Sequence, residues 1–408
     1  MRICIVSREY PPESGWGGIG LSYQDVALGL ASKGHEVHVI CQAVRCAGTS
    51  FDRGVWVHRV GHLSARFSLV ARLDYSICAF FKLVELNRKL KLGLVDVPTF
   101  AGEPVLPMMA GVRPVIVSVH GLHEESLRAR NFKGFPGQLA LRILSRLEGP
   151  ILRRADMVVV LTRGTRRRLV TTYNISESRV RVLPTAVDPE YYQDTTDHAD
   201  MREQLGGGHV AVSVGRLEPN KGYEFFLRAI PKVLRSIPHF TALLVGADTK
   251  TGPDSTSYKG LLENLATILG IVPHVRFLGK VTPKEVVELL SVGDILVVPS
   301  INDEFPRVVL EAMACERPVV TTALDYVSEL PSESDVYTVK SGDYDALAEQ
   351  IVYAIKETGG VSKKNREIVM SSFSSEIRTE RLYELYEQAL SHSMRERGPR
   401  SATGFPAT

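Results

Sequence analysis

The chain has 408 residues, of which 44% are apolar and 23% charged, and its net charge is +3. A single hydrophobic core stops growing at roughly 250–300 residues, so we expect two domains. The composition excludes a disordered chain, and the apolar runs stay below the ~18 residues that a membrane span needs.

The N-terminus and the cysteines favour a reducing compartment. The start MRICIVSREY holds too short an apolar run for a signal peptide and predicts a first strand instead. Neither metal-ligand spacing nor an even disulfide set is present among the five cysteines, Cys4, Cys41, Cys46, Cys78 and Cys315. We therefore expect a cytoplasmic protein.

Strand-like and helix-like segments alternate along the chain. In the first half the predicted strands are 3–7, 35–41, 114–120 and 157–161, and the predicted helices lie near 20–33 and 137–153. After a polar, glycine-rich stretch the alternation restarts, with strands at 209–217, 241–246, 275–279, 294–300 and 317–322 and helices near 223–236, 257–269, 283–291 and 306–315. Such alternation predicts an α/β fold with two parallel, doubly wound sheets.

The predicted domains are residues 1–188 and 189–375. A C-terminal helix at 376–393 is predicted to pack back on the first domain, and residues 394–408 are predicted to form a disordered tail. The helix carries an apolar stripe at helical spacing, formed by Leu382, Leu385, Tyr386 and Leu390. In such sheets ligands bind beyond the carboxyl ends of the strands, so the loops there are the candidate sites.

The first such loop, YPPESGWGGIG, contains the letters of G-x-G-x-x-G at Gly15, Gly17 and Gly20. A dinucleotide site needs these glycines directly after the strand and an acid at the end of the second strand, which here ends in Cys41-Gln42. We therefore expect no NAD, FAD or other cofactor. Gly17, Gly18 and Gly20 instead open a helix whose N–H groups face an anion or a sugar hydroxyl, unless they only cap that helix.

A second loop, VGRLEPNKG, ends a strand with Arg216 and Lys221. Arginine offers a planar fork matched to phosphate oxygens and lysine offers a point charge, so together they suit a diphosphate. The alternative is a pair of solvated surface cations.

The third loop precedes an apolar helix that contains an acid, in NDEFPRVVLEAMACERPVV. If this helix begins at Pro306, the N–H groups of Arg307 and Val308 point toward an anion. Asp303 in the loop and Glu311 in the helix then lie where carboxylates accept hydrogen bonds from sugar hydroxyls. The alternative makes Asp303 a helix cap and Glu311 an exposed residue.

The segments VGRLEPNKGYEFFLRAI, VRFLGKVTPKEVVELLSVGDILVVPS and DEFPRVVLE followed by AMACERPVV resemble the retaining family-4 glycosyltransferases (glycosyl transferases group 1). This resemblance implies a GT-B fold, in which two Rossmann-like domains face each other across a cleft, the first binding the acceptor and the second the donor. It also implies that Arg216 and Lys221 bind the donor diphosphate, Asp303 the donor sugar and Glu311 the ribose. In VSVHGLHEE it places His120 at the reacting centre, so His120 and Asp303 are the catalytic candidates.

Two positions depart from the family pattern. Asp303 is one methylene shorter than the family's glutamate, which bears on the choice of donor sugar. Leu324-Asp325 stands where the family often has Gly-Gly, which bears on backbone access to the ligand.

The resulting hypothesis is a retaining transfer of a hexose-type sugar from a UDP-sugar or GDP-sugar to an acceptor hydroxyl of a glycan, a lipid-linked molecule or a small molecule, without a metal. One alternative is a nucleotide-sugar epimerase on the same fold. The other is a non-catalytic protein that binds sugar nucleotides.

Basic runs and an Asp-Tyr-Asp sequence suggest other partners. The runs at 163–168 and 88–91 are able to contact an anionic membrane surface peripherally, although solvated helix faces are the alternative. They lack interleaved aromatic residues, so we expect no nucleic acid. Asp343-Tyr344-Asp345 resembles a metal–nucleotide motif but opens a helix, which indicates a cap, and His120 and His123 do not complete a metal site.

Overall fold

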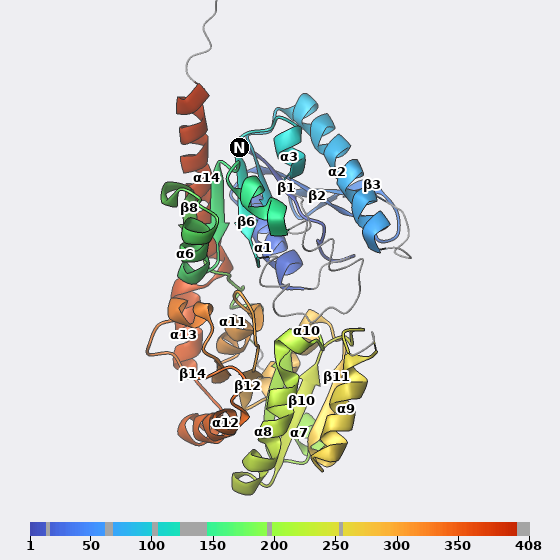
Figure 1. The fold of residues 1–408 in the computed structure, drawn as a ribbon, viewed down its shortest axis with the longest axis vertical. Coiled ribbons are helices and arrows are strands. Elements are labelled where there is room, and N and C mark those ends of the chain that lie inside the picture. Colours follow the sequence, from blue (N-terminus) through green and yellow to red (C-terminus); the bar gives the residue numbers. More distant parts are fainter. Residues whose placement is uncertain are drawn as a thin grey trace, which may run out of the picture.

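The computed structural model describes residues 1–13, 17–61, 68–99, 105–122, 145–193, 198–252 and 256–397. Two lobes lie one above the other, each built on its own parallel sheet (Figure 1). We call them the N-terminal lobe, built on strands β1 to β8, and the C-terminal lobe, built on strands β9 to β14. The predicted α/β class with two doubly wound sheets is confirmed.

The N-terminal sheet has the order β3-β4-β2-β1-β5-β6-β7-β8, and β3 is antiparallel to β4 while the other pairs are parallel. Its strands are β1 Arg2–Val6, β2 Glu36–Gln42, β3 Gly48–Asp52, β4 Val55–Val60, β5 Leu94–Pro98, β6 Val115–Val119, β7 Met157–Val160 and β8 Val180–Val182. One face packs on α1 Gly18–Ser32 and α14 Ser375–Arg397, and the other packs on α2 Ser68–Leu90, α3 Val105–Met109 and α6 Arg163–Thr172. The central strands are buried on both faces, which is why their sequences are almost continuously apolar.

The C-terminal sheet has the order β11-β10-β9-β12-β13-β14, with every pair parallel in the described chain. Its strands are β9 His209–Val214, β10 Phe240–Val245, β11 Val275–Gly279, β12 Ile295–Val298, β13 Val319–Thr322 and β14 Val336–Val339. One face packs on α8 Tyr223–Ser236, α9 Tyr258–Ile268 and α12 Tyr344–Thr358, and the other packs on α10 Pro283–Val292, α11 Arg307–Ala314 and α13 Lys363–Ser372. A short helix, α7 Ala199–Gln204, precedes the sheet.

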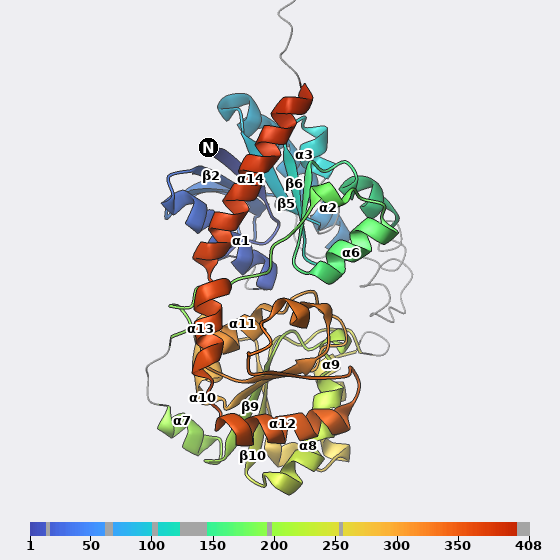
Figure 2. The same cartoon turned by 90° about the vertical axis from the view of Figure 1, so that its left-hand side faces the viewer.

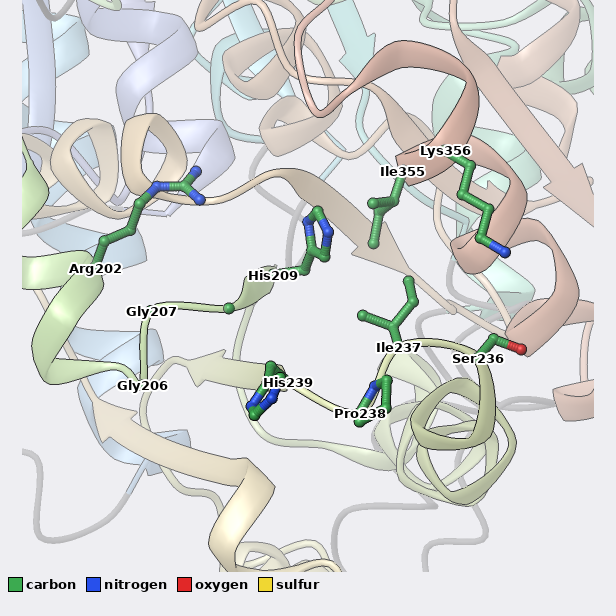
Figure 3. Close-up of a pocket in the computed structure, with 11 residues that line it drawn as sticks. Arg202, Gly206, Gly207, His209, Ser236, Ile237, Pro238, His239, Ile355 and Lys356 are labelled. Carbon is green, nitrogen blue, oxygen red and sulfur yellow. The ribbon is translucent and has the colours of Figure 1, made fainter.

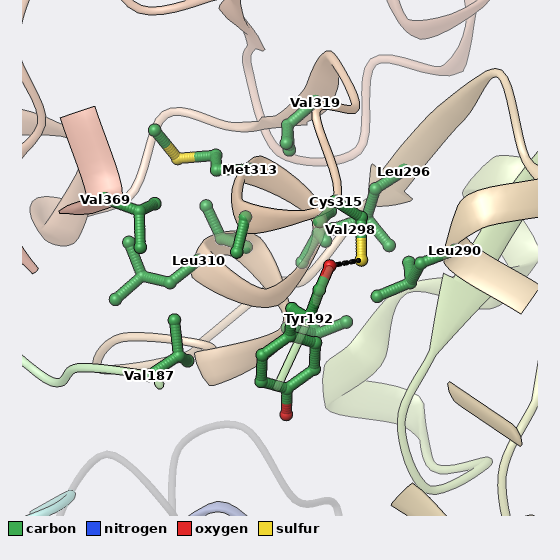
Figure 4. Close-up of a cluster of buried hydrophobic side chains, with 14 of the residues drawn as sticks. Val187, Tyr192, Leu290, Leu296, Val298, Leu310, Met313, Cys315, Val319 and Val369 are labelled. Carbon is green, nitrogen blue, oxygen red and sulfur yellow. Dashed lines mark hydrogen bonds between the residues drawn. The ribbon is translucent and has the colours of Figure 1, made fainter. Parts of the chain in front are cut away.

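Helix α11 belongs to the core of the C-terminal lobe. Leu310 and Met313 of α11 are fully buried against β12, α13 and Tyr192 (Figure 4). The helix begins at Arg307, one residue later than the predicted start at Pro306, which is its N-cap with ψ 114°. The apolar residues of α11 are therefore part of the core. The candidate site must lie at the N-terminus of this helix and on the side that carries Glu311.

The chain crosses between the lobes twice, and the two crossings run side by side. Val187 pairs with Ser374 in a parallel bridge, and its N–H donates to the carbonyl of Phe373 at 3.1 Å. From there α14 runs along the N-terminal lobe against α1 (Figure 2). Leu382 and Tyr386 of the predicted stripe are buried in that lobe, while Leu385 and Leu390 are partly buried. Helix α14 continues to Arg397, so the prediction of a disordered tail at 394–408 is wrong for residues 394–397, and the rest of that tail lies outside the described residues.

Candidate functional site

The loops after β9 and β12 lie against each other at the carboxyl end of the C-terminal sheet. Ile301 donates its N–H to the carbonyl of Asn220 at 2.8 Å. Gly222 takes the left-handed conformation, with φ 67°, and a Cβ there would overlap the carbonyl of Pro299, so only glycine lets the loops approach this closely. As a result Nζ of Lys221 lies 2.5 Å from Oδ2 of Asp303. The structure thus brings Lys221, one of the residues predicted to hold the diphosphate, next to Asp303, which was predicted to hold the sugar.

Arg216 lies on the same loop but points more toward solvent. Its guanidinium is 3.0 Å from the buried carboxylate of Glu218, and 62% of its side chain is exposed. The exposed remainder of the guanidinium fork is therefore accessible to a phosphate.

Two helix N-termini meet beside this loop. Helix α11 begins at Arg307, and α1 begins at Gly18 with Gly17 as its N-cap. A Cβ on Gly18 would lie 3.9 Å from Cβ of Arg307, so the glycine loop of one lobe touches the helix start of the other. Gly20 is buried in the first turn. Among the described residues neither N-cap is satisfied by a side chain, which leaves two positive helix ends close together and suits an anion.

Glu311 is buried, so the alternative that it lies on an exposed helix face is wrong. It is 7% exposed, and its Oε1 accepts a hydrogen bond from Nε of Arg307 at 3.1 Å. Nη1 of Arg307 reaches across to Oδ2 of Asp25 in α1 at 2.7 Å. That contact is an ion pair and not a well-aligned hydrogen bond. Burial raises the pKa of Glu311, while the Arg307 charge and the Tyr192 hydroxyl oppose this change.

The side chain of Asp303 does not cap α11, so that alternative is also wrong for the described chain. The N-cap is Pro306, and the Asp303 carboxylate contacts Lys221 instead, with Oγ of Ser300 at 3.5 Å.

His120 follows β6 on the N-terminal side of the same junction. Its ring centroid is 5.6 Å from that of Tyr23. Burial, helped by the charge of Arg378, lowers the pKa of His120 to about 3, so its imidazole is neutral at neutral pH. A neutral imidazole has one donor and one acceptor nitrogen, as a sugar hydroxyl requires. A Cβ on Gly121 would lie 4.0 Å from Cγ of Glu304, which places the end of β6 against the loop that carries Asp303.

Sequence reasoning missed a cluster of contacts between α6 and the C-terminal lobe. Buried Glu304 accepts a hydrogen bond from Oγ1 of Thr165 at 2.6 Å and lies 3.4 Å from Nη2 of Arg168. Arg168 also pairs with Asp325. The arginine run of α6 was the available signal, because two of its arginines contact carboxylates of the C-terminal lobe: Arg163 contacts Glu329, and Arg168 contacts Glu304 and Asp325. Arg166 pairs with Glu177 of its own lobe.

A second group that sequence reasoning missed surrounds Asp96, which shares its neighbour Tyr23 with His120. Asp96 of β5 is 1% exposed and is held by three hydroxyl donors. Tyr386 of α14 donates to Oδ2 at 2.5 Å, while Ser118 and Tyr23 donate to Oδ1 at 3.0 and 3.2 Å. Burial raises the pKa of Asp96, and these donors oppose that change. The helix at the end of the chain therefore completes the polar core of the N-terminal lobe.

A hollow of about 800 Å³ opens elsewhere, between Gly206, His209, His239 and Lys356 (Figure 3). His209 begins β9 and His239 precedes β10, so the hollow lies at the amino ends of the strands, opposite the loops described above. The guanidinium of Arg202 at its rim is paired with Asp294 at 2.8 Å.

Other predicted features take structural roles or lie outside the described chain. Asp343 caps α12 by accepting the N–H of Ala346 at 2.9 Å. Gly15 and His123 fall outside the described residues. Within the described ranges, no helix is both long and apolar enough to cross a membrane.

Two family models match the chain over most of its length. Residues 16–191 match Glycosyltransferase Family 4, and residues 208–357 match Glycosyl transferases group 1. An uncharacterized glycosyltransferase of Methanocaldococcus jannaschii is 26% identical over 81% of this chain and 82% of its own length. A D-inositol 3-phosphate glycosyltransferase of Acidothermus cellulolyticus is 29% identical over 74% of this chain and 70% of its own.

Solved structures agree with the architecture. Sucrose-phosphate synthase of Thermosynechococcus elongatus superposes with a TM-score of 0.76 at 19% identity, covering 96% of this chain and 99% of that one. HepE of Anabaena, solved in complex with UDP-glucose, gives a TM-score of 0.74 at 20% identity, covering 95% and 99%. These likenesses show the GT-B fold. With the family matches, they establish that the chain belongs to the family-4 GT-B glycosyltransferases, and it is a glycosyltransferase.

Proposed function

We propose that the protein transfers a hexose-type sugar from a nucleoside-diphosphate sugar to an acceptor hydroxyl, with retention of the anomeric configuration. The observation that carries the proposal is the contact between Lys221 and Asp303, because it places a phosphate-binding cation and a sugar-binding carboxylate side by side. The two helix N-termini at Gly18 and Arg307 lie in the same region of the molecule.

The donor diphosphate is assigned to Lys221, Arg216 and the N–H groups of Arg307 and Val308. These groups supply positive charge where the leaving group gains negative charge, which is the largest single source of stabilisation in many enzymes. Glu311 is assigned to the ribose hydroxyls. HepE of Anabaena was solved with UDP-glucose, which supports a nucleotide-sugar donor and UDP as the first nucleotide to test.

The sugar is assigned to Asp303 and His120, which approach from different lobes. The bond between the anomeric carbon and the diphosphate oxygen breaks, and the acceptor oxygen bonds to the same face of that carbon. The acceptor proton passes to the departing diphosphate oxygen, so neither a protein nucleophile nor a separate base is required. His120 donates or accepts one hydrogen bond at a sugar hydroxyl, since its imidazole is neutral.

Product analysis with a panel of UDP-sugars and GDP-sugars tests the proposal. We expect nucleoside diphosphate to appear much faster when an acceptor mixture is present, and NMR of the product to show the donor's anomeric configuration. Isomerised donor without acceptor would indicate an epimerase instead. Tight binding with no turnover on any acceptor would indicate a binding protein, and an inverted product would contradict the retaining chemistry.

We also propose a cytoplasmic location with a peripheral membrane contact. All five cysteines are free, which supports the cytoplasm. For a peripheral membrane contact the support comes from α2, where Ile77 and Phe81 are exposed and Arg88 and Lys89 lie in the last turn. The arginine run of α6 gives weaker support for a membrane contact, because most of its arginines already contact carboxylates.

A further inference from the structure

We infer that Arg307 is a positioning residue that couples nucleotide binding in the C-terminal lobe to helix α1 of the N-terminal lobe. The inference rests on the proposed function, in which Glu311 binds the ribose. Arg307 contacts two carboxylates at once, Glu311 of its own helix at 3.1 Å and Asp25 of α1 at 2.7 Å.

The three side chains are shielded from water, so their geometry is constrained. Counted over the side chain alone, the exposed fraction is 8% for Arg307, 9% for Glu311 and 25% for Asp25. A buried ion pair that loses one partner leaves an uncompensated charge, and Arg307 therefore depends on both acids. The guanidinium can satisfy both of them only while α1 and α11 keep their present separation.

Asp25 lies where three elements meet. Oγ of Ser375, the first residue of α14, is 3.5 Å from Oδ2 of Asp25. The start of α14 is also the second crossing between the lobes (Figure 2). A Cβ on Gly18, the first residue of α1, would lie 3.9 Å from Cβ of Arg307. A change in the angle between the lobes would therefore act on the Asp25–Arg307 contact.

The consequence concerns the orientation of Glu311. Arg307 holds Oε1 of this carboxylate and the Tyr192 hydroxyl also contacts it, so the direction of Oε2 toward a ribose depends in part on a residue that is itself held by the other lobe. Coupling of this kind is reciprocal: if Asp25 strengthens nucleotide binding, the nucleotide strengthens the contact between the lobes by the same factor. Asp25 thus affects nucleotide affinity although its own side-chain contacts are with Arg307 and Ser375.

Calorimetry with UDP and GDP on the full chain tests the inference, using Asp25→Asn because Asp25 is the least buried of the three. We expect the Kd of the nucleotide that binds to rise about five- to tenfold, the lower part of the usual range of coupling. In a Glu311→Gln background the same change should have less than about a twofold effect, because the carboxylate to be oriented is gone. Arg307→Lys keeps the charge but loses the fork that contacts both acids, so it should weaken the nucleotide at least as much as Asp25→Asn.

Lys33→Met is the matched control, since Lys33 joins α1 to Glu380 of α14 at 2.9 Å without contacting the C-terminal lobe. It should leave the Kd unchanged. If Asp25→Asn lowers Tm but not nucleotide affinity, the contact is only structural and the inference is overturned. If Lys33→Met weakens binding equally, loosening of α1 explains the effect and the inference again fails. If Glu311→Gln alone does not weaken the nucleotide, the ribose assignment of the proposed function fails, which is a separate result.

Discussion

Lys221 and Asp303 form an ion pair at 2.5 Å across two loops of the C-terminal lobe, with 22% and 18% of their side chains exposed. A diphosphate that binds Lys221 must therefore share this cation with Asp303, and the two anions are brought close to each other.

Asp303→Asn should lower turnover without weakening the binding of the nucleoside diphosphate. Removing the carboxylate frees Lys221 for phosphate, so we expect the affinity for the nucleoside diphosphate to be unchanged or higher. Turnover should fall by about tenfold or more, because a hydrogen bond to a charged group contributes roughly 1.5–3 kcal/mol. Calorimetry and initial rates measure the two effects. Weaker binding of the nucleoside diphosphate together with normal turnover would mean that the roles of Asp303 and Glu311 are interchanged.

Lys221→Ala and Arg216→Ala should each raise the KM for the donor. Loss of a charge-assisted contact predicts about a 10- to 100-fold increase, with Arg216 near the lower end because it is the more exposed. Steady-state kinetics over donor concentration is the measurement. Lys232→Ala is the control, since Lys232 pairs with Asp345 and Glu349 on α12. Unchanged kinetics in both site variants would remove the diphosphate assignment.

His58→Gln should reduce the loss of stability in acid. His58 of β4 is buried, with its Nε2 3.1 Å from Nδ1 of His38, and burial together with the nearby Lys82 lowers its pKa to about 4. The unfolded chain keeps a pKa near the ordinary 6.5 and so binds more protons between these values. Stability from this site is therefore present above pH 6.5 and is lost as pH falls toward about 4.

The measurement for His58→Gln is Tm at about pH 7.5 and about pH 5, where the unfolded chain but not the folded site is protonated. The variant should show a smaller decrease between the two than the wild type. Thr49 and Glu85 also face the imidazole and stay unchanged in both proteins. Parallel curves for the two proteins would show that His58 is not responsible for the acid sensitivity.

Tyr386→Phe should destabilise the attachment of α14 to the N-terminal lobe. The variant leaves an oxygen of buried Asp96 without its 2.5 Å donor, which predicts a loss of about 1–3 kcal/mol. Tyr383→Phe, three residues earlier, removes only a contact to Glu387 and should change stability by less than about 0.5 kcal/mol. Chemical denaturation compares the two. Equal effects would contradict a special role for the buried hydroxyl.

The fold class could be predicted because parallel strands that are buried on both faces have nearly continuous apolar sequences, as in ILVV of β12 and VIVSV of β6. The hairpin strands β3 and β4 were missed, since β3 lies at the sheet edge and is mostly exposed. Helix α2 was missed too, as were strand β5 and the loops around them.

The candidate donor residues could be named from the sequence because they lie on loops directly after strands, where a parallel sheet places its ligands. The contacts between these residues could not be predicted from the sequence. Lys221 and Asp303 are far apart in the chain, and only the close approach at Gly222 brings them into contact. Asp25 and Arg307 belong to different lobes, so their contact depends on how two separately packed sheets are oriented. Such a contact has no local periodicity or spacing in the chain, because it is formed by the packing of whole lobes rather than by neighbouring residues.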